Sequence, residues 1–375
     1  MAAHVLASTE APLTHLQRVL LTISRLWAWL FLALLILFFV ATVPVFSGIS
    51  FLSVRNSQNI LVAIVPVLLL GLGQTFVIIS AGIDLSVGWV MSLASVLSAL
   101  ALRDSFNAGV PLPLAVLLGL LAGVFGGGMV GLVNGLIIAK LKVPAFIVTL
   151  GSSFMVRGLA LLWSENTTVV GLPDGVRAYG NDSLFYAIRG DHGGFYIFSP
   201  PALTGDMLRQ MDRILSWPVV VTILTVLLSM FLLHRTQFGR YTYAIGGNIQ
   251  AALRAGIPVD RHIIKIYTLS AAMAGLAGFL STLQFTGGSA SIGDPLLLSS
   301  IAGVIIGGVS LFGGAGTIIG TVIGALIIAV LTTGLVMLNV QAFWQFIVVG
   351  AVVIIAVLID QSRDLIVGRF SGGSE

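Results

Sequence analysis

Long apolar runs recur along this sequence, and they constrain its fold more than any other feature. A helix of about 20 apolar residues crosses the roughly 30 Å hydrocarbon core of a bilayer. Hydrophobic residues make up 57% of the chain and charged residues 9%, against about 25% charged in soluble proteins. The sequence therefore predicts an all-α, polytopic integral membrane protein with about ten transmembrane helices. The predicted spans are residues 26–45, 60–80, 85–102, 112–138, 146–163, 217–233, 264–285, 296–311, 317–337 and 343–359.

Glycine-rich segments break several of these runs. Residues 81–84 separate the second and third runs and are too short for an ordinary loop between two full spans, so irregular backbone is expected at membrane depth. Further breaks occur at 287–288 and 313–314, and residues 82–88 are weakly echoed by 308–314. Broken segments in the two halves of a transporter point to a transport site near the repeat interface.

A row of glycines marks one face of the fourth run. They recur every four residues, which places them along one side of a helix. Because that side lacks side chains, another helix backbone can approach it closely, and five such positions are less expected by chance than one pair. We therefore predict a tight helix contact along Gly119, Gly123, Gly127, Gly131 and Gly135.

Basic residues divide unevenly between the segments that connect the runs. Eleven lie in tails and loops on one predicted side and six on the other, while Arg157 stands inside a run. Lys and Arg accumulate on the cytoplasmic side, so we predict cytoplasmic tails at 1–25 and 361–375. Between them, residues 26–360 form a single transmembrane domain. Residues 164–216 are its extracytoplasmic loop and 234–263 its main cytoplasmic segment.

Two ionisable residues, Asp84 and Arg157, lie in apolar surroundings. An uncompensated charge there costs at least about 2.5 to 3.5 kcal/mol. Asp84 could cap the helix that follows it or line a substrate path, and one residue could do both. Arg157 lies 11 residues after Phe146, roughly 16 Å along a helix. Asp84 is its expected partner, and a watery cavity or free backbone carbonyls are the alternative.

Motifs for cofactor or metal chemistry are absent from the sequence. It contains no G-x-x-x-x-G-K-[ST] phosphate loop and no cysteine, and its five histidines lack the spacing of a metal site. Ser and His do not fall in a hydrolase signature. We therefore predict no catalytic residues, no metal, no cofactor and no nucleic-acid binding, which indicates a transporter component rather than an enzyme.

An arginine-rich polar segment, residues 235–261, separates two apolar runs. Within it, Asn248 can cap a helix, residues 249–255 contain good helix formers, Gly256 suits a left-handed position and Pro258 prevents continuation. A helix of about two turns is marginal in water. The start and stop signals therefore indicate a rigid element presented to another molecule, although an ordinary loop helix fits the same pattern.

Several longer motifs follow one another along the chain. They include GQTFVIISAGIDLSVG ending at Gly88, VPAFIVTLG ending at Gly151, FGRYTYAIGGN ending at Asn248 and IGGVSLFGGAGTIIGTVIGA ending at Ala325. In these residues the chain resembles the inner-membrane permeases of bacterial sugar ABC importers of the ribose, xylose and arabinose type, over residues 56–360. The resemblance implies a multi-pass protein of the bacterial inner membrane that imports a monosaccharide, with a pentose such as xylose or ribose favoured.

The resemblance also implies three protein partners besides the lipid bilayer. These are a cytoplasmic ATP-binding subunit, a periplasmic sugar-binding protein and a second permease copy. The residues assigned to coupling with the ATPase are Gly246, Gly247, Asn248, Ile249, Ala251, Ala252, Arg254 and Gly256. The residues assigned to the substrate path are Gln74, Gly82, Asp84, Ser86, Asn134, Phe146 and Arg157.

Two other functions remain open at this point. A related ABC permease could carry another small solute, such as a nucleoside, an autoinducer or a branched-chain amino acid. An ion-coupled secondary transporter is the more distant alternative, because such a protein would place coupling acids in several spans. Asp84 is the only acid within the apolar runs.

Overall fold

The computed structural model describes residues 15–188, 194–198, 211–352, 354–355 and 358, with side chains from Leu26 onward. In these residues, eight helices are long and apolar enough to cross a membrane, which confirms the predicted helical, multi-pass membrane fold. They are α1 (His15–Ser47), α2 (Val54–Ile79), α3 (Val87–Asn107), α4 (Leu112–Leu141), α5 (Ala145–Trp163), α8 (Trp217–Arg235), α11 (Val259–Phe285) and α13 (Ile318–Met337).

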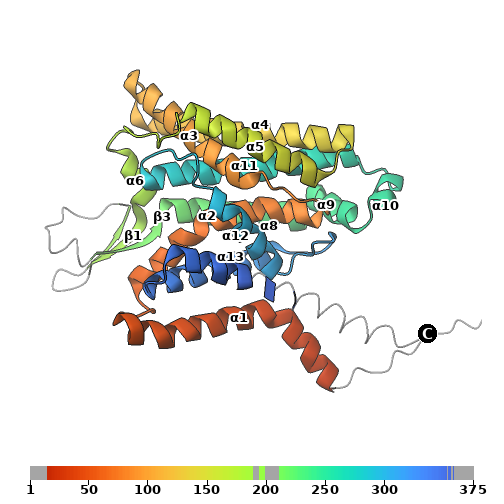
Figure 1. The fold of residues 1–375 in the computed structure, drawn as a ribbon, viewed down its shortest axis with the longest axis horizontal. Helices are drawn as coiled ribbons and strands as arrows, with labels where there is room; N and C mark the ends of the chain where they lie inside the picture. The colour runs from red at the N-terminus through yellow and green to blue at the C-terminus, as the bar shows by residue number, and fades with distance from the viewer. Residues whose placement is uncertain (1–14, 189–193, 199–210, 353, 356–357, 359–375) are drawn as a thin grey trace, which may run out of the picture.

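Helices α2 and α11 form the centre of the bundle (Figure 1). Helix α11 packs against α4, α3 and α2, and α2 also packs against α13, α12 (Asp294–Ile306) and α8. From Ile64 to Ile79, every residue of α2 except Pro66 is buried. A helix that is surrounded by other helices has to be apolar or internally hydrogen-bonded on every face, and this stretch is rich in Leu, Val and Ile.

The five glycines that recur every four residues in the fourth run all lie buried on one face of α4. Gly119 faces the carbonyl oxygen of Ser98 on α3, and Gly127, Gly131 and Gly135 face the backbone of α11. A Cβ atom at Gly135 would lie 2.7 Å from the Cα atom of Ile264. The absence of side chains therefore lets α4 approach α11 at backbone distance.

The eighth predicted span, residues 296–311, is wrong as a full helix. Helix α12 ends at Ile306 after 13 residues, which is about 20 Å at 1.5 Å per residue. Gly308 follows with φ of +83°, a backbone conformation that ends the helix. The remaining chain up to Thr317 runs as a glycine-rich loop before α13 begins.

One other predicted boundary differs from the structure. Helix α1 begins at His15, so part of the predicted tail 1–25 is helical, and residues 1–14 lie outside the described residues. The tenth span is described as a helix over Ala342–Val352. The tail 361–375 lies wholly outside the described residues.

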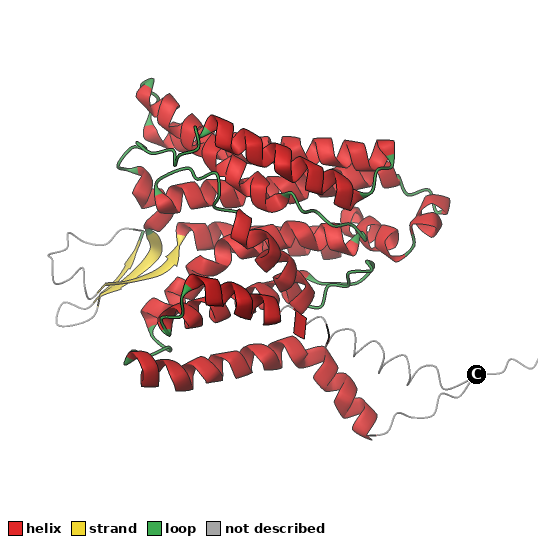
Figure 2. Cartoon of the chain, viewed as in Figure 1, coloured by secondary structure: helices red, strands yellow, loops and turns green. Residues whose placement is uncertain are grey.

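The loop 164–216, for which the sequence predicts an extracytoplasmic position, contains strands that the sequence analysis did not predict. Strands β1 (Ser183–Ile188), β2 (Gly194–Ile197) and β3 (Met211–Ser216) form an antiparallel sheet in the order β2-β1-β3, which is drawn in yellow in Figure 2. Helix α6 (Val176–Asn181) precedes the sheet and packs against α11. Strand β3 runs directly into α8, so the sheet is attached to the bundle.

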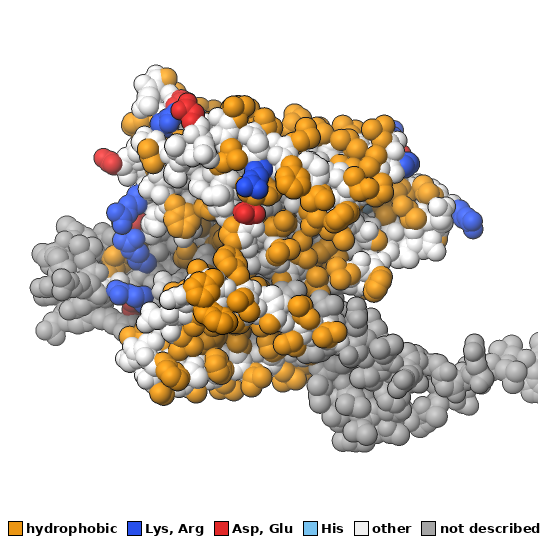
Figure 3. All heavy atoms as spheres, viewed as in Figure 1, with side chains coloured by type: hydrophobic (Ala, Val, Ile, Leu, Met, Phe, Trp, Pro, Cys, Tyr) orange, Lys and Arg blue, Asp and Glu red, His pale blue; other side chains and the backbone are white. Residues whose placement is uncertain are grey.

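The bundle has two distinct ends. The sheet lies at one end, while α9 (Gln237–Gly247) and α10 (Ile249–Arg254) lie at the other (Figure 1). Figure 3 shows apolar side chains over the middle of one face and most charged side chains toward its two ends. This distribution matches a bilayer, whose core excludes charge and whose surfaces accept it.

Candidate functional site

A buried polar cluster lies where the chain breaks between α2 and α3. The Asp84 carboxylate is fully buried, and its Oδ1 accepts hydrogen bonds from the Ser86 backbone N–H at 3.0 Å and the Ser86 hydroxyl at 2.6 Å. Its Oδ2 accepts from the Ser270 hydroxyl at 3.3 Å. The Asn134 side-chain amide donates to the Ser86 hydroxyl at 3.1 Å, and the Gln74 amide donates to the Asp84 carbonyl.

Three helices and one loop build this cluster. Gln74 comes from α2, Asn134 from α4 and Ser270 from α11, while Asp84 and Ser86 belong to the loop that enters α3. The Asp84 carboxylate accepts a hydrogen bond from the N–H of Ser86, the residue before α3, and not from N–H groups in the first turn of α3. The predicted capping role of Asp84 is therefore met only in part. The cluster is therefore a tertiary site and not a local turn.

Close backbone packing surrounds the break. A Cβ atom at Gly82 would lie 2.5 Å from the Tyr267 hydroxyl, and one at Gly73 would lie 2.8 Å from the Cα atom of Ser270. Ala81 has a positive φ of 62°, which is uncommon for a residue with a side chain. Glycine at positions 73 and 82 therefore allows α11 to bring Tyr267 and Ser270 against the loop.

The cluster contains polar atoms that have no protein partner. In the described part of the chain, the side-chain oxygens of Gln74 and Asn134 and the hydroxyl of Tyr267 are buried without a hydrogen bond. An unmatched buried polar group costs about 1 to 3 kcal/mol. Two carbonyl oxygens can accept hydrogen bonds and a phenol can donate or accept, so each of the three atoms is of a kind that a hydroxyl group can match.

Five of the seven predicted path residues meet in or beside this cluster, and the two on α5 do not. The predicted partnership of Arg157 with Asp84 is wrong. Arg157 is exposed, and its guanidinium carbon lies 4.6 Å from the centroid of the Trp89 ring on α3. Helix α5 packs against α3 and α4, whereas the Asp84 carboxylate faces α11. Phe146 is likewise 52% exposed on α5.

The sequence analysis missed Tyr267 and Ser270. Both lie in an apolar run without a motif, and hydroxyl side chains are common in membrane helices. The glycine face of α4 offered an indirect signal, because it required a partner helix with small residues. That partner is α11, where Ala271, Ala274 and Gly275 are buried.

A cavity of about 430 Å³ connects the neighbourhood of the cluster with the α9–α10 end. Its lining includes Gly82 from the break, Tyr267 from α11, and Gly246 and Asn248 from the polar segment. Tyr267 thus borders both the cavity and the break at Gly82. The cluster consequently lies close to the surface where α9 and α10 emerge.

Helix α10 has the predicted caps. The Asn248 side chain accepts a hydrogen bond from the Ala251 N–H at 2.9 Å, and Gly256 follows the helix with φ of +78°. Ala252 is buried, while Ile249 and Leu253 are 45% and 49% exposed. Ala252 thus packs α10 against the rest of the protein, while Ile249, Leu253 and the exposed Arg254 face outward.

Backbone contacts tie this polar segment to two chain breaks. A Cβ atom at Gly246 would overlap the carbonyl of Ile79 at the end of α2. The Gly314 N–H donates to that same carbonyl at 2.8 Å. The loop before α13 therefore meets α9 and the end of α2 in one place.

Comparison with known proteins relates most of the chain to transport permeases. The family described as "Branched-chain amino acid transport system / permease component" matches residues 56–357. The chain is 37% identical over 314 residues to the fructose import permease protein FrcC of Rhizobium meliloti, covering 84% of this chain and 80% of that protein. The ribose import permease protein RbsC of Bacillus subtilis is also 37% identical, with 84% and 87% covered. The xylose transport system permease protein XylH of Escherichia coli K12 is 35% identical, with 84% and 86% covered. No solved structure matches the chain.

Proposed function

This chain belongs to the family of branched-chain amino acid transport system permease components, and we propose that it is the transmembrane permease subunit of a sugar ABC importer. Its cargo is a monosaccharide, with a pentose favoured. Relatives that cover most of its length are named import permeases for fructose, ribose and xylose. The chain is not an enzyme itself, and ATP is hydrolysed by a separate subunit.

The observation that carries the proposal is the buried cluster around Asp84. Its groups are amides, hydroxyls and one carboxylate, and three of its polar atoms are unmatched among the described residues. Sugars offer hydroxyl groups that both donate and accept, so they complement such a set. Gln74, Asp84, Ser86 and Asn134 are the side chains proposed to bind the sugar, with Gly82 beside them.

The two ends of the bundle suit different partners. We place the cytoplasmic ATP-binding subunit at the α9–α10 end, where Ile249, Leu253 and Arg254 are exposed. The basic residues concentrate on the same side, which supports cytoplasmic tails at both ends of the chain. The periplasmic sugar-binding protein then binds at the sheet end, which faces the periplasm when the chain lies in the inner membrane.

A second permease copy is proposed to cover α5. Only four of its 19 residues are buried, and Phe154, Met155 and Leu162 are 65%, 72% and 69% exposed. An apolar surface of this kind can also face lipid. Phe146 and Arg157, however, can contribute to the predicted substrate path only if another chain encloses them. A homodimer would achieve this without a further gene product.

The alternatives make different demands on the same site. A secondary transporter needs protonatable or ion-binding groups in several spans, yet Asp84 is the only fully buried acid in the described part of the chain. A permease for a branched-chain amino acid would need to match an ammonium and a carboxylate group. The cluster offers a single carboxylate and no buried cation among the described residues.

The test is reconstitution of the chain in liposomes with its ATP-binding subunit and its binding protein. We expect accumulation of labelled xylose, ribose or fructose only when ATP is present, and no loss of uptake when ionophores remove the ion gradients. Gln74→Leu should lower uptake, since it removes an unmatched acceptor from the cluster. Accumulation of solute by the purified chain alone under an ion gradient would contradict the proposal that the chain belongs to an ATP-driven importer.

A further inference from the structure

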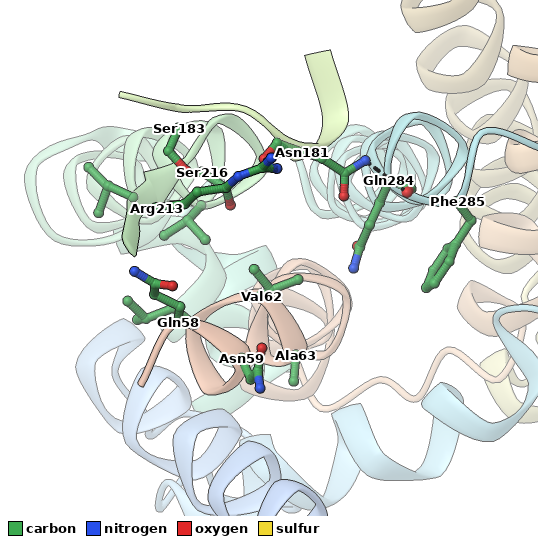
Figure 4. Close-up of a pocket in the computed structure, with 13 residues that line it drawn as sticks. Gln58, Asn59, Val62, Ala63, Asn181, Ser183, Arg213, Ser216, Gln284 and Phe285 are labelled. Atoms are coloured by element: carbon green, nitrogen blue, oxygen red, sulfur yellow. Dashed lines mark hydrogen bonds between the residues drawn. The ribbon is translucent and has the colours of Figure 1, made fainter. Parts of the chain in front are cut away.

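A second cavity lies at the sheet end, away from the Asp84 cluster. It has a volume of about 540 Å³, which falls within the usual range of small-molecule sites. Figure 4 shows Gln58 and Asn59 of α2, Arg213 of β3 and Gln284 of α11 around this space. Its lining thus comes from the bundle and from the sheet together.

The sheet holds Arg213 at the rim of the cavity. Arg213 pairs with Tyr186 in the register of β1 and β3. Its Nη1 donates to the Asn181 carbonyl at 3.1 Å, and the Asn181 side-chain amide donates to the Gln284 carbonyl at 3.1 Å. Within the described residues Arg213 forms no ion pair, so most of its five N–H donors remain available to a ligand.

Two further polar groups at the cavity have no partner in the described structure. They are the side-chain nitrogen of Gln58 and the hydroxyl of Ser216, and both atoms are buried. A buried donor without an acceptor is unfavourable. Oxygen atoms of a ligand placed between Gln58 and Arg213 would satisfy both residues.

The chemistry of the lining favours a neutral, polyhydroxylated ligand. Guanidinium and amide N–H groups donate to hydroxyl oxygens, and the side-chain oxygens of Asn59 and Gln284 accept hydroxyl protons. Phe285 is 63% exposed beside these groups, and its ring offers an apolar surface to the C–H face of a sugar. A simple anion would use Arg213 but would leave the amide oxygens unused.

This cavity is separate from the cluster around Asp84. Gln58 and Gln74 are 16 residues apart on α2, which corresponds to about 24 Å. Between them, α2 is filled by buried apolar residues such as Leu69 and Leu70. A ligand in one site therefore does not touch the other in this conformation.

We propose that the cavity between α2, β3 and α11 is an entry site that binds the monosaccharide before it reaches the Asp84 cluster. The proposal rests on the proposed import function and extends it by giving the loop 164–216 a role. The loop supplies Asn181, Ser183, Arg213 and Ser216 to the cavity. Its sheet thereby positions ligand-binding groups as well as covering the bundle.

The absence of cysteine from the sequence allows a direct test on the full chain without any partner. Ala63→Cys places a thiol at the cavity, and Ser57→Cys places one on an exposed part of α2 outside it. The rate of maleimide modification is measured in nanodiscs with and without xylose, ribose or fructose. We expect at least one sugar to slow modification at position 63 several-fold and to leave position 57 unchanged.

Variants of the lining then separate binding from folding. In the Ala63→Cys background, Arg213→Gln and Gln58→Leu should abolish protection by sugar while the rate without sugar and the elution profile stay the same. Arg213→Lys should retain only part of the protection, because an ammonium group lacks the planar fork of donors. Xylonate serves as the anionic comparison.

The outcomes distinguish this site from the import function. Lack of protection by any of the three sugars, in a chain whose assembled importer takes one of them up, would overturn the entry site and leave the importer intact. Equal protection at positions 57 and 63, or protection by xylonate alone, would also overturn it. Specific protection at position 63 in a chain that shows no ATP-dependent uptake would support the site and count against the importer.

Discussion

The Tyr243 hydroxyl donates a hydrogen bond to the carbonyl oxygen of Gly316 across 2.6 Å. This bond joins α9, in the polar segment, to the glycine-rich loop that precedes α13. Burial raises the pKa of Tyr243 above its ordinary value, so the hydroxyl keeps its proton throughout the neutral range. A movement of α9 would therefore be transmitted to a break in the membrane bundle through this contact.

We expect Tyr243→Phe to weaken this connection without disturbing insertion. The change removes one hydrogen bond, worth about 0.5 to 1.5 kcal/mol, and keeps the ring. ATP hydrolysis stimulated by sugar and binding protein should fall in the assembled importer. Tyr241→Phe is the matched control, because the Tyr241 hydroxyl contacts only the exposed Gln237 side chain among the described residues. Equal effects of the two changes would contradict the proposed connection.

Ser86→Ala should damage the buried cluster. It removes one of the hydrogen bonds to Asp84 and leaves the Asn134 amide nitrogen without its acceptor. We expect a loss of stability of about 1 to 3 kcal/mol and a drop in sugar uptake. Ser98→Ala is the control, since the buried Ser98 hydroxyl has no partner in the described structure. Thermal unfolding in detergent should show that this control is neutral or slightly stabilising.

Gly127→Leu should lower the yield of folded protein, because a Cβ atom at Gly127 would overlap the Ala271 carbonyl on α11. Gly128→Ala offers a control one residue away, where a new Cβ would lie 3.8 Å from the Ala272 side chain. That control should be neutral or gain up to about 1 kcal/mol from helix propensity. Size-exclusion chromatography of both variants measures the difference. A stable Gly127→Leu variant that had lost only transport would show that the glycine face lines a path.

Gly256→Val should distort the end of α10, because its φ of +78° strains a β-branched residue. Apart from the adjacent residues, no atom of the described structure lies within 4 Å of the position a Cβ would take, so this variant tests the backbone conformation. We expect normal insertion but loss of co-purification with the ATP-binding subunit. Gly256→Asn should retain binding, since Asn tolerates this conformation. Normal assembly of the valine variant would remove α10 from the proposed coupling contact.

Arg157 and Asp84 should behave independently in a mutant cycle. Arg157→Asp and Asp84→Arg each introduce a wrong charge, and the double swap should recover nothing, because Arg157 lies over Trp89. By contrast, Arg157→Gln and Trp89→Leu should show coupling of about 0.5 to 2 kcal/mol in folding stability. Recovery of yield or transport by the charge swap would restore the ion pair that the sequence suggested.

Some features of this protein could be predicted from the sequence because they depend on neighbouring residues. Length and apolar character decide whether a segment can cross a bilayer, and eight of the ten predicted runs are helices that can do so. The ends of α10 follow from Asn248 and Gly256, since capping involves only residues within one turn. Family membership was likewise visible in contiguous motifs such as the one ending at Gly88.

Other features depend on how the helices are rotated and packed, which no local pattern specifies. Asp84 had several possible partners, and only the close packing of α11 on Gly73 and Gly82 brought Ser270 to it instead of Arg157. The short α12 and the sheet that carries Arg213 were not predicted for the same reason. Helix α12 packs against α13 and α2, and the sheet is stabilised by contacts with α2 and with the ends of α8 and α11. The sequence by itself determined a membrane-spanning sugar permease whose polar segment contains a short helix with a cap at each end. Tertiary structure alone decided which polar side chains meet, since that outcome depends on distances between segments up to 246 residues apart in the chain.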